Sequence, residues 1–136
     1  MCPSPRSSAA IRPALDRLYA EFNADHSVAD PVWIVRRFER PDDREVVGFI
    51  ASALAFGRVQ SVLNSIEGML EVMGTSPASF VRRFDPARDR ECFTHLVHRW
   101  TNGADFAAMV WILKQMLARS GSVEGFFAEG LADDAV

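Results

Sequence analysis

Residues 46–56 form an apolar run that constrains the fold more than any other part of the sequence. Only Gly48 and Ser52 interrupt the run, so a helix over it is hydrophobic on every side. Such a helix is stable in the middle of a bundle, where other helices cover it from all directions. The run is too short to span a bilayer, which takes about 20 apolar residues.

The residues that flank this run predict where its helix begins and ends. Asp42, followed by Glu45 three residues later, has the pattern of a capping box at a helix N-terminus. Gly57 stands where a left-handed C-terminal cap is expected. The sequence therefore predicts a helix over residues 42–57 at the centre of the protein.

The other segments also predict helices, because their apolar residues recur at spacings of three and four. The first helix is expected over residues 8–22, with its start near Arg12 because Pro13 fits only near a first turn. Its apolar face is expected to pack as part of the scaffold. The further predicted helices cover residues 31–38, 58–73, 77–84 and 105–121, with a last segment from residue 122, while residues 87–100 fit helix or loop. No window shows the alternation of a strand, so we expect an all-α fold.

Length and pattern predict a single domain. A chain of 136 residues can bury a core without disulfides or metals. We expect a disordered N-terminus over residues 1–7, one helical domain over residues 8–130 and a tail over residues 131–136. With two cysteines and no secretory apolar stretch near the N-terminus, the expected location is the cytoplasm, away from membranes.

The charge argues against a uniformly basic nucleic-acid-binding protein. The net charge is -3, and the excess of acidic residues lies in residues 101–136. Fourteen of the 15 basic residues are arginine, a ratio that codon bias explains more simply than selection for phosphate binding. Any contact with DNA or RNA therefore has to come from a local arginine patch.

The best candidate for a metal site in the sequence is formed by Cys92, His95 and His98, with the neighbouring Glu91. Their spacing places them on one side of a helix. Zinc usually takes four ligands, and no second cluster supplies the remaining one, so we expect no metal and a buried Cys92. Motifs of phosphate-binding loops, hydrolases, metalloproteases and kinases are missing. We therefore assign no catalytic residue and no cofactor, and we leave enzymatic activity open.

His98, Arg99 and Trp100 are the most promising binding unit of the sequence. Basic side chains beside a large aromatic ring can hold a phosphate or stack a base. A partly buried anchor between two helices explains the same residues equally well.

Three stretches of the sequence resemble an uncharacterised bacterial family of conserved hypothetical proteins. They are Asp43–Arg58, Met73–Pro77 and His98–Thr101. The resemblance extends from about Asp30 to Gly130, which is nearly all of the chain. Members of that family continue well past residue 136, so we expect this chain to be the N-terminal part of a longer protein.

The order of segments is also similar, more distantly, to helix-hairpin-helix DNA glycosylases. In those enzymes a buried helix, a helix packed against it and a short helix started by proline follow one another, as Ile50–Ala55, Arg58–Met73 and Ser76–Phe80 do here. Leu54 stands where the glycosylases commonly have a glutamine that probes the duplex, so that role is not carried over. Their hairpin and catalytic aspartate come later in the family than residue 136.

The similarity to glycosylases implies an orthogonal helical bundle that binds nucleic acid without catalytic residues in this chain. The implied partner is DNA, and the candidate contact residues are Arg44, Arg58, His98 and Arg99. The alternative function is a non-catalytic scaffold or protein-interaction domain, which the near-zero arginine excess of residues 1–100 favours. The sequence identifies no protein partner.

Overall fold

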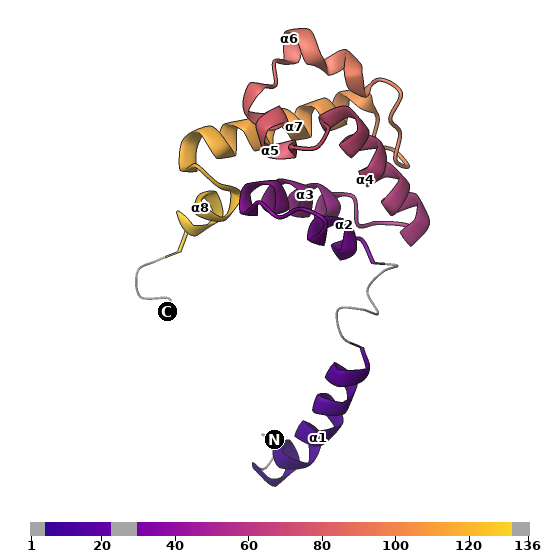
Figure 1. The fold of residues 1–136 in the computed structure, drawn as a ribbon, viewed down its shortest axis with the longest axis vertical. Coiled ribbons are helices and arrows are strands. Elements are labelled where there is room, and N and C mark those ends of the chain that lie inside the picture. The colour runs from indigo at the N-terminus through magenta and orange to yellow at the C-terminus, as the bar shows by residue number, and fades with distance from the viewer. Residues whose placement is uncertain (1–4, 23–29, 132–136) are drawn as a thin grey trace. The chain divides into compact units, whose positions relative to one another are not determined.

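The computed structural model describes residues 5–22 and 30–131, and the chain divides into two compact units. The first unit, Met1–Asp30, contains helix α1 (Pro5–Glu21). The second unit, Pro31–Val136, contains α2 (Val32–Arg36), α3 (Pro41–Ala53), α4 (Val59–Met73), α5 (Pro77–Arg83), α6 (Pro86–Asp89), the 3₁₀ helix η2 (Arg90–Phe93), α7 (Gly103–Ser120) and α8 (Val123–Ala128) (Figure 1). Across the described ranges, β-structure is confined to one bridge between His98 and Thr101. The expected all-α class is therefore confirmed.

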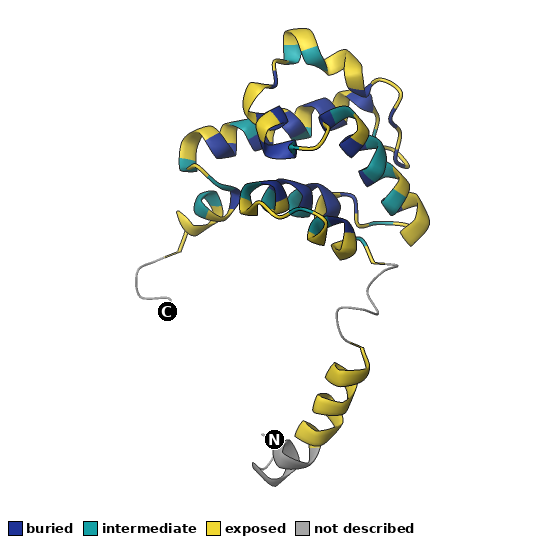
Figure 2. Ribbon diagram, in the orientation of Figure 1, coloured by how far each residue is buried: buried dark blue, intermediate teal, exposed yellow. Residues whose placement is uncertain are grey.

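Helix α1 differs from the prediction in its start and in its surroundings. It begins at Pro5 and continues through Pro13, so the predicted start near Arg12 is wrong. The face that was expected to pack is exposed instead, because no second helix of this unit covers it among the described residues (Figure 2). Its members are Ile11, Leu15, Leu18, Tyr19 and Phe22, each at least half exposed.

The predicted domain boundaries fall partly on residues that the structure does not describe. A disordered N-terminus was expected over residues 1–7 and a tail over residues 131–136, and of these, residues 1–4 and 132–136 lie outside the described residues. Residues 5–7 are the first residues of α1. A single helical domain over residues 8–130 would span both units and stays a prediction.

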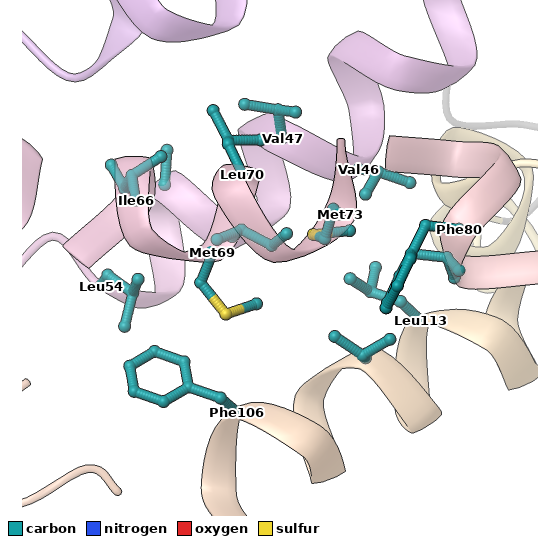
Figure 3. Close-up of a cluster of buried hydrophobic side chains, with 14 of the residues drawn as sticks. Val46, Val47, Leu54, Ile66, Met69, Leu70, Met73, Phe80, Phe106 and Leu113 are labelled. Atoms are coloured by element: carbon teal, nitrogen blue, oxygen red, sulfur yellow. The ribbon is translucent and has the colours of Figure 1, made fainter. Parts of the chain in front are cut away.

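Helix α3 lies at the centre of the second unit, as its sequence predicts. Val46, Val47 and Ile50 are fully buried, and the helix packs against α2, α4, α5 and α8. Figure 3 shows side chains of α3 in one cluster with those of α4, α5 and α7. Burial of each such side chain contributes about 1.5–3 kcal/mol, so this cluster is the main source of stability of the unit.

The capping box predicted for Asp42 and Glu45 at the start of α3 is wrong, because Glu45 holds another helix, as does the neighbouring Asp43. Helix α3 begins at Pro41 without a side-chain cap. The Glu45 carboxylate accepts hydrogen bonds from the backbone N–H groups of Val123 (2.7 Å) and Glu124 (3.2 Å), at the start of α8. Buried Asp43 accepts the backbone N–H of Ala78 (2.8 Å), at the start of α5. The two acids therefore fix α5 and α8 to α3.

The end of α3 also differs from the prediction. The helix ends at Ala53, and the backbone N–H of Phe56 turns back to the carbonyl of Leu54 at 2.7 Å. Leu54 itself stays in the core, with 2% of its surface exposed. Gly57, expected as the helix cap, lies instead in the linker before α4 and has a φ of +107°. This linker carries Phe56 out of the core and toward the turn described below.

Asp43→Ala is expected to lower the free energy of unfolding by about 2 kcal/mol, because the buried N–H of Ala78 loses its acceptor. Asp43→Asn keeps an acceptor oxygen and should cost clearly less. Urea denaturation of both variants at neutral pH measures the difference. Equal losses for the two variants would contradict the capping role.

Asp42 should make the fold sensitive to acid. Hydrogen bonds from Arg40, and to a lesser extent from Arg82, hold the pKa of Asp42 well below its ordinary value of 3.8. Because the folded-state pKa is the lower one, this stabilisation is complete above the ordinary pKa and is lost as the pH falls through the folded-state pKa. Asp42→Asn should therefore lower stability by about 1 kcal/mol at neutral pH and flatten its decline in acid. Thermal unfolding between about pH 7 and pH 2.5 measures this, and an unchanged decline would contradict it.

Candidate functional site

A two-residue turn between η2 and α7 carries the residues that the sequence singles out. The backbone groups of His98 and Thr101 bond to each other in both directions at 2.9 Å, which leaves Arg99 and Trp100 at the tip. Arg99 has a φ of +56°, a left-handed conformation that costs a non-glycine residue about 1–2 kcal/mol. Trp100 is 75% exposed. We call residues 98–101 the Arg99 turn.

His98 attaches the Arg99 turn to the body of the domain. Its side chain is 2% exposed, and its Nε2 lies 3.1 Å from the carbonyl oxygen of Phe56. Because a carbonyl only accepts, Nε2 carries the proton of this bond. The Nδ1 atom lies 2.8 Å from the hydroxyl oxygen of Ser65 on α4. His98 therefore joins the turn to α4 and to the linker that follows α3.

The other end of the turn is fixed by the start of α7. The Asn102 side chain accepts the backbone N–H of Ala104 (2.9 Å), and the Asp105 carboxylate accepts the backbone N–H of Asn102 (2.8 Å), which is a capping box. Gly103 lies so close to η2 that a Cβ atom there would be 2.5 Å from the carbonyl oxygen of Phe93. With both ends anchored, the turn holds its tip in a fixed position.

Contacts between aromatic rings hold the tip of the turn against the linker that follows α3. The rings of Phe56 and Trp100 stack with centroids 4.9 Å apart and planes 15° apart, while Phe56 meets the ring of His98 edge to face at 4.7 Å. The guanidinium carbon of Arg99 lies 5.6 Å from the centroid of Trp100, within cation–π distance. Gly57 gives room to this guanidinium, because a Cβ atom there would be 3.0 Å from its Nη1.

Arg58 follows Gly57 and adds a second cation beside the turn. It precedes the first residue of α4 in extended conformation, and its side chain is exposed. Within the described part of the chain, neither Arg58 nor Arg99 has an ion-pair partner. Many other arginines do, and these are Arg12, Arg37, Arg40, Arg82, Arg88 and Arg119. The two charges at the turn are therefore available to an anion from outside.

The structure brings three of the four predicted contact residues together. His98 and Arg99 share the turn, and Arg58 adjoins Gly57, which touches Arg99. Arg44 lies apart: it is on α3, ten residues before Leu54 or about 15 Å along the helix axis, and its Nε donates to the carbonyl of Phe38.

Sequence reasoning missed Phe56, Gly57 and Ser65 as parts of this site. Phe56 is counted in the sequence as the end of the apolar run, and Gly57 as a helix cap. Ser65 is one of several polar residues of α4, and it is half-buried. The only available signal was the placement of a glycine and an arginine directly after an apolar helix, which does not by itself indicate a partner 40 residues away.

The structure also shows how the candidate metal ligands are arranged. Cys92 and His95 are exposed, so the expected burial of Cys92 is wrong, while both nitrogens of His98 face Phe56 and Ser65. The short 3₁₀ helix η2 ends at Phe93, so the regular helix that would align these residues is not formed. Over residues 5–22 and 30–131, no group of three metal-ligating side chains is close enough to hold an ion.

A cleft with a volume of about 440 Å³ lies away from the Arg99 turn. Its lining residues are Arg37, Phe38, Glu39, Arg40, Asp43, Leu70, Gly74 and Thr75. Arg37 pairs with Glu67 at 2.9 Å, and Arg40 pairs with Asp42 at 3.1 Å. Because its cations already have carboxylate partners, this cleft offers no net charge to a ligand.

A smaller cleft of about 340 Å³ lies between α6 and α7 and is mainly apolar. Its lining residues are Pro86, Arg90, Ala104, Ala107, Ala108 and Trp111. Trp111 is 41% exposed, and the ammonium group of Lys114 lies 5.5 Å from the centroid of its ring. This surface, which we call the Trp111 groove, could receive an apolar side chain.

The fold and the site define an all-α domain with an exposed turn that carries Arg99 and Trp100, beside Arg58, and neither arginine has an ion-pair partner among the described residues. The model of the family described as "Protein of unknown function (DUF2400)" matches residues 30–136. This match covers most of the chain, so the chain belongs to the DUF2400 family, and the predicted membership of an uncharacterised family is confirmed.

Other comparisons add no relative. No curated protein and no solved structure matches the chain. The similarity to DNA glycosylases has no support from these searches and stays a prediction. None of the described helices has the length and apolar character that a membrane span requires.

Two replacements of Arg99 test whether its left-handed backbone conformation is strained. Arg99→Gly and Arg99→Ala both remove the guanidinium, but only glycine adopts a φ of +56° without strain. We expect Arg99→Gly to be more stable than Arg99→Ala by about 1 kcal/mol, as measured by urea denaturation. A more stable alanine variant would show that the left-handed backbone is not strained.

Proposed function

We propose that this domain binds nucleic acid at the Arg99 turn, with Arg58 and Arg99 contacting phosphates. The observation that carries the proposal is the pair of exposed guanidiniums, without carboxylate partners among the described residues, beside a tryptophan that is 75% exposed. Phosphate contacts by basic side chains supply essentially all of the sequence-independent affinity of proteins for nucleic acid, and aromatic side chains add contacts to bases.

The charge distribution supports a local contact over a broad one. The net charge of the chain is -3, so the protein as a whole does not attract a polyanion. Attraction has to come from local cations, and the two beside the turn lack the carboxylate pairing seen at Arg37, Arg40 and Arg82. Such a site makes few phosphate contacts, and its affinity should depend only moderately on salt.

The four predicted contact residues take different roles in this proposal. Arg58 and Arg99 contact the ligand, whereas His98 acts as a positioning residue because its ring is buried and both nitrogens are bonded within the protein. Arg44 stays a predicted contact, although it lies on α3 and not at the turn.

A relation to helix-hairpin-helix DNA glycosylases remains part of the proposal only at the level of architecture. The order of buried helix, packed helix and proline-started helix occurs here as α3, α4 and α5. Leu54, at the position of the duplex-probing glutamine, is 2% exposed and packs in the core. That position therefore supports no contact with a duplex, and the proposed binding relies on the turn instead.

Arg58→Ala and Arg99→Ala should each weaken binding of short DNA about equally for all base sequences, since phosphates carry no sequence information. Each variant should also reduce the slope of log affinity against log salt by about one. Fluorescence anisotropy with labelled oligonucleotides at several salt concentrations measures both effects.

Arg88→Ala is the matched control, because it changes the net charge equally but removes an arginine paired with Asp89 at 2.7 Å. It should leave affinity and salt dependence nearly unchanged. Equal weakening by all three variants would indicate a general charge effect and contradict a site at the turn.

The second candidate function is a protein-interaction domain, and the Trp111 groove is the observation that favours it. Three alanines and a proline leave room beside an exposed indole, as in surfaces that bind an apolar side chain of a partner. The groove and the Arg99 turn involve different residues. Trp111→Ala should therefore not affect DNA binding, which makes it a further control for the first proposal.

A further inference from the structure

We infer that Trp100 stacks on an unpaired base, so that the Arg99 turn selects single-stranded nucleic acid over duplex. This inference rests on the proposed function and specifies its ligand. The observation behind it is that the indole of Trp100 is fixed in orientation by a neighbouring ring and is still exposed to solvent.

The orientation of the indole is set by Phe56. The two rings are nearly parallel, at 15°, with centroids 4.9 Å apart, and Phe56 is held in turn by edge-to-face contact with buried His98. Trp100 remains 75% exposed despite this stacking and despite the Arg99 guanidinium over its ring, so much of the indole is open to a planar base. A planar base placed there would extend the stack, and stacking does not depend on which base it is.

The cations lie where the backbone of a stacked nucleotide would run. The Arg99 guanidinium carbon is 5.6 Å from the centroid of the Trp100 ring, and Gly57 keeps space for it beside Arg58. A base on Trp100 therefore brings its own phosphates close to both guanidiniums. Aromatic platforms flanked by cations are the usual means of binding single strands without sequence preference.

A duplex cannot use the same contact. Its bases are paired and stacked on each other, so their faces are covered except at the ends. A duplex would therefore gain only the phosphate contacts of Arg58 and Arg99. The structure thus predicts that the preference for single strands depends on Trp100, whereas the salt-dependent part of binding depends on the arginines.

Trp100→Ala should weaken binding of single-stranded DNA roughly tenfold or more and leave binding of duplex DNA nearly unchanged, because stacking of a base is lost. Trp100→Phe should retain part of the preference for single strands. The affinities are measured by anisotropy on the full chain, with Trp111→Ala as the matched control for loss of an exposed tryptophan. Thermal unfolding of each variant establishes that the fold persists.

An abasic oligonucleotide of the same length tests stacking directly, because it keeps the phosphates and lacks the bases. The native chain should bind the abasic strand roughly tenfold more weakly than the normal strand. The Trp100→Ala variant should bind the abasic and the normal strand with equal affinity. In a Trp33→Phe/Trp111→Phe chain, Trp100 is the sole tryptophan. Its fluorescence should be quenched by the normal strand and not by the abasic one.

The outcomes separate this inference from the proposed function. Equal affinity for normal, abasic and duplex DNA, with Arg99→Ala weakening all three, would overturn stacking and leave the arginine site intact. No binding of any of the three by the folded native chain would overturn both. A single-strand preference that survives in Trp100→Ala and Trp100→Phe would also overturn the assignment of Trp100.

Discussion

The structure depends on the burial of α3, which is apolar on almost every side and has to be surrounded. Val46, Val47 and Ile50 are completely enclosed, and helices from both earlier and later parts of the chain pack on this one element. Its few acids then determine how the neighbours are arranged. Asp43 and Glu45 accept the N-terminal N–H groups of α5 and α8, where the helix dipole favours negative charge.

The candidate site is an extension of the same arrangement. Helix α3 ends at Ala53, and the following linker presents the carbonyl of Phe56 to His98, whose other nitrogen meets Ser65 on α4. Buried polar groups of this kind are costly unless bonded, so the satisfied ring fixes the turn to the body. The fixed turn then presents Arg99, in a strained conformation, and an exposed Trp100. Strain of this kind often marks functional sites in proteins.

The fold class and most helices could be predicted from the sequence because their signals are local. Periodic apolar residues locate α4, α5 and α7, whereas residues 87–100, which include most of α6 and all of η2, fit helix or loop in the sequence. The role of Glu45 could not be predicted, because the same spacing fits a capping box within α3 and a bond to α8, 78 residues away. Side chains can thus satisfy a local pattern and still be used by a distant partner.

The site was predictable in its residues and not in its geometry. A basic and aromatic triplet pointed to residues 98–100, but sequence alone does not show which of them faces inward. Burial decides this: His98 is enclosed, and Trp100 is open. Phe56 and Gly57 join the site only through a contact with residues more than 40 positions later, for which no local pattern exists.

Mapping of backbone amide chemical shifts by NMR during titration with a short single-stranded oligonucleotide tests the central claim most directly. The account predicts that the largest changes fall on residues 56–58 and 98–101, with smaller changes at Ser65 through the His98 bond. Changes centred on the Trp111 groove, or none at all in a folded chain, would contradict it.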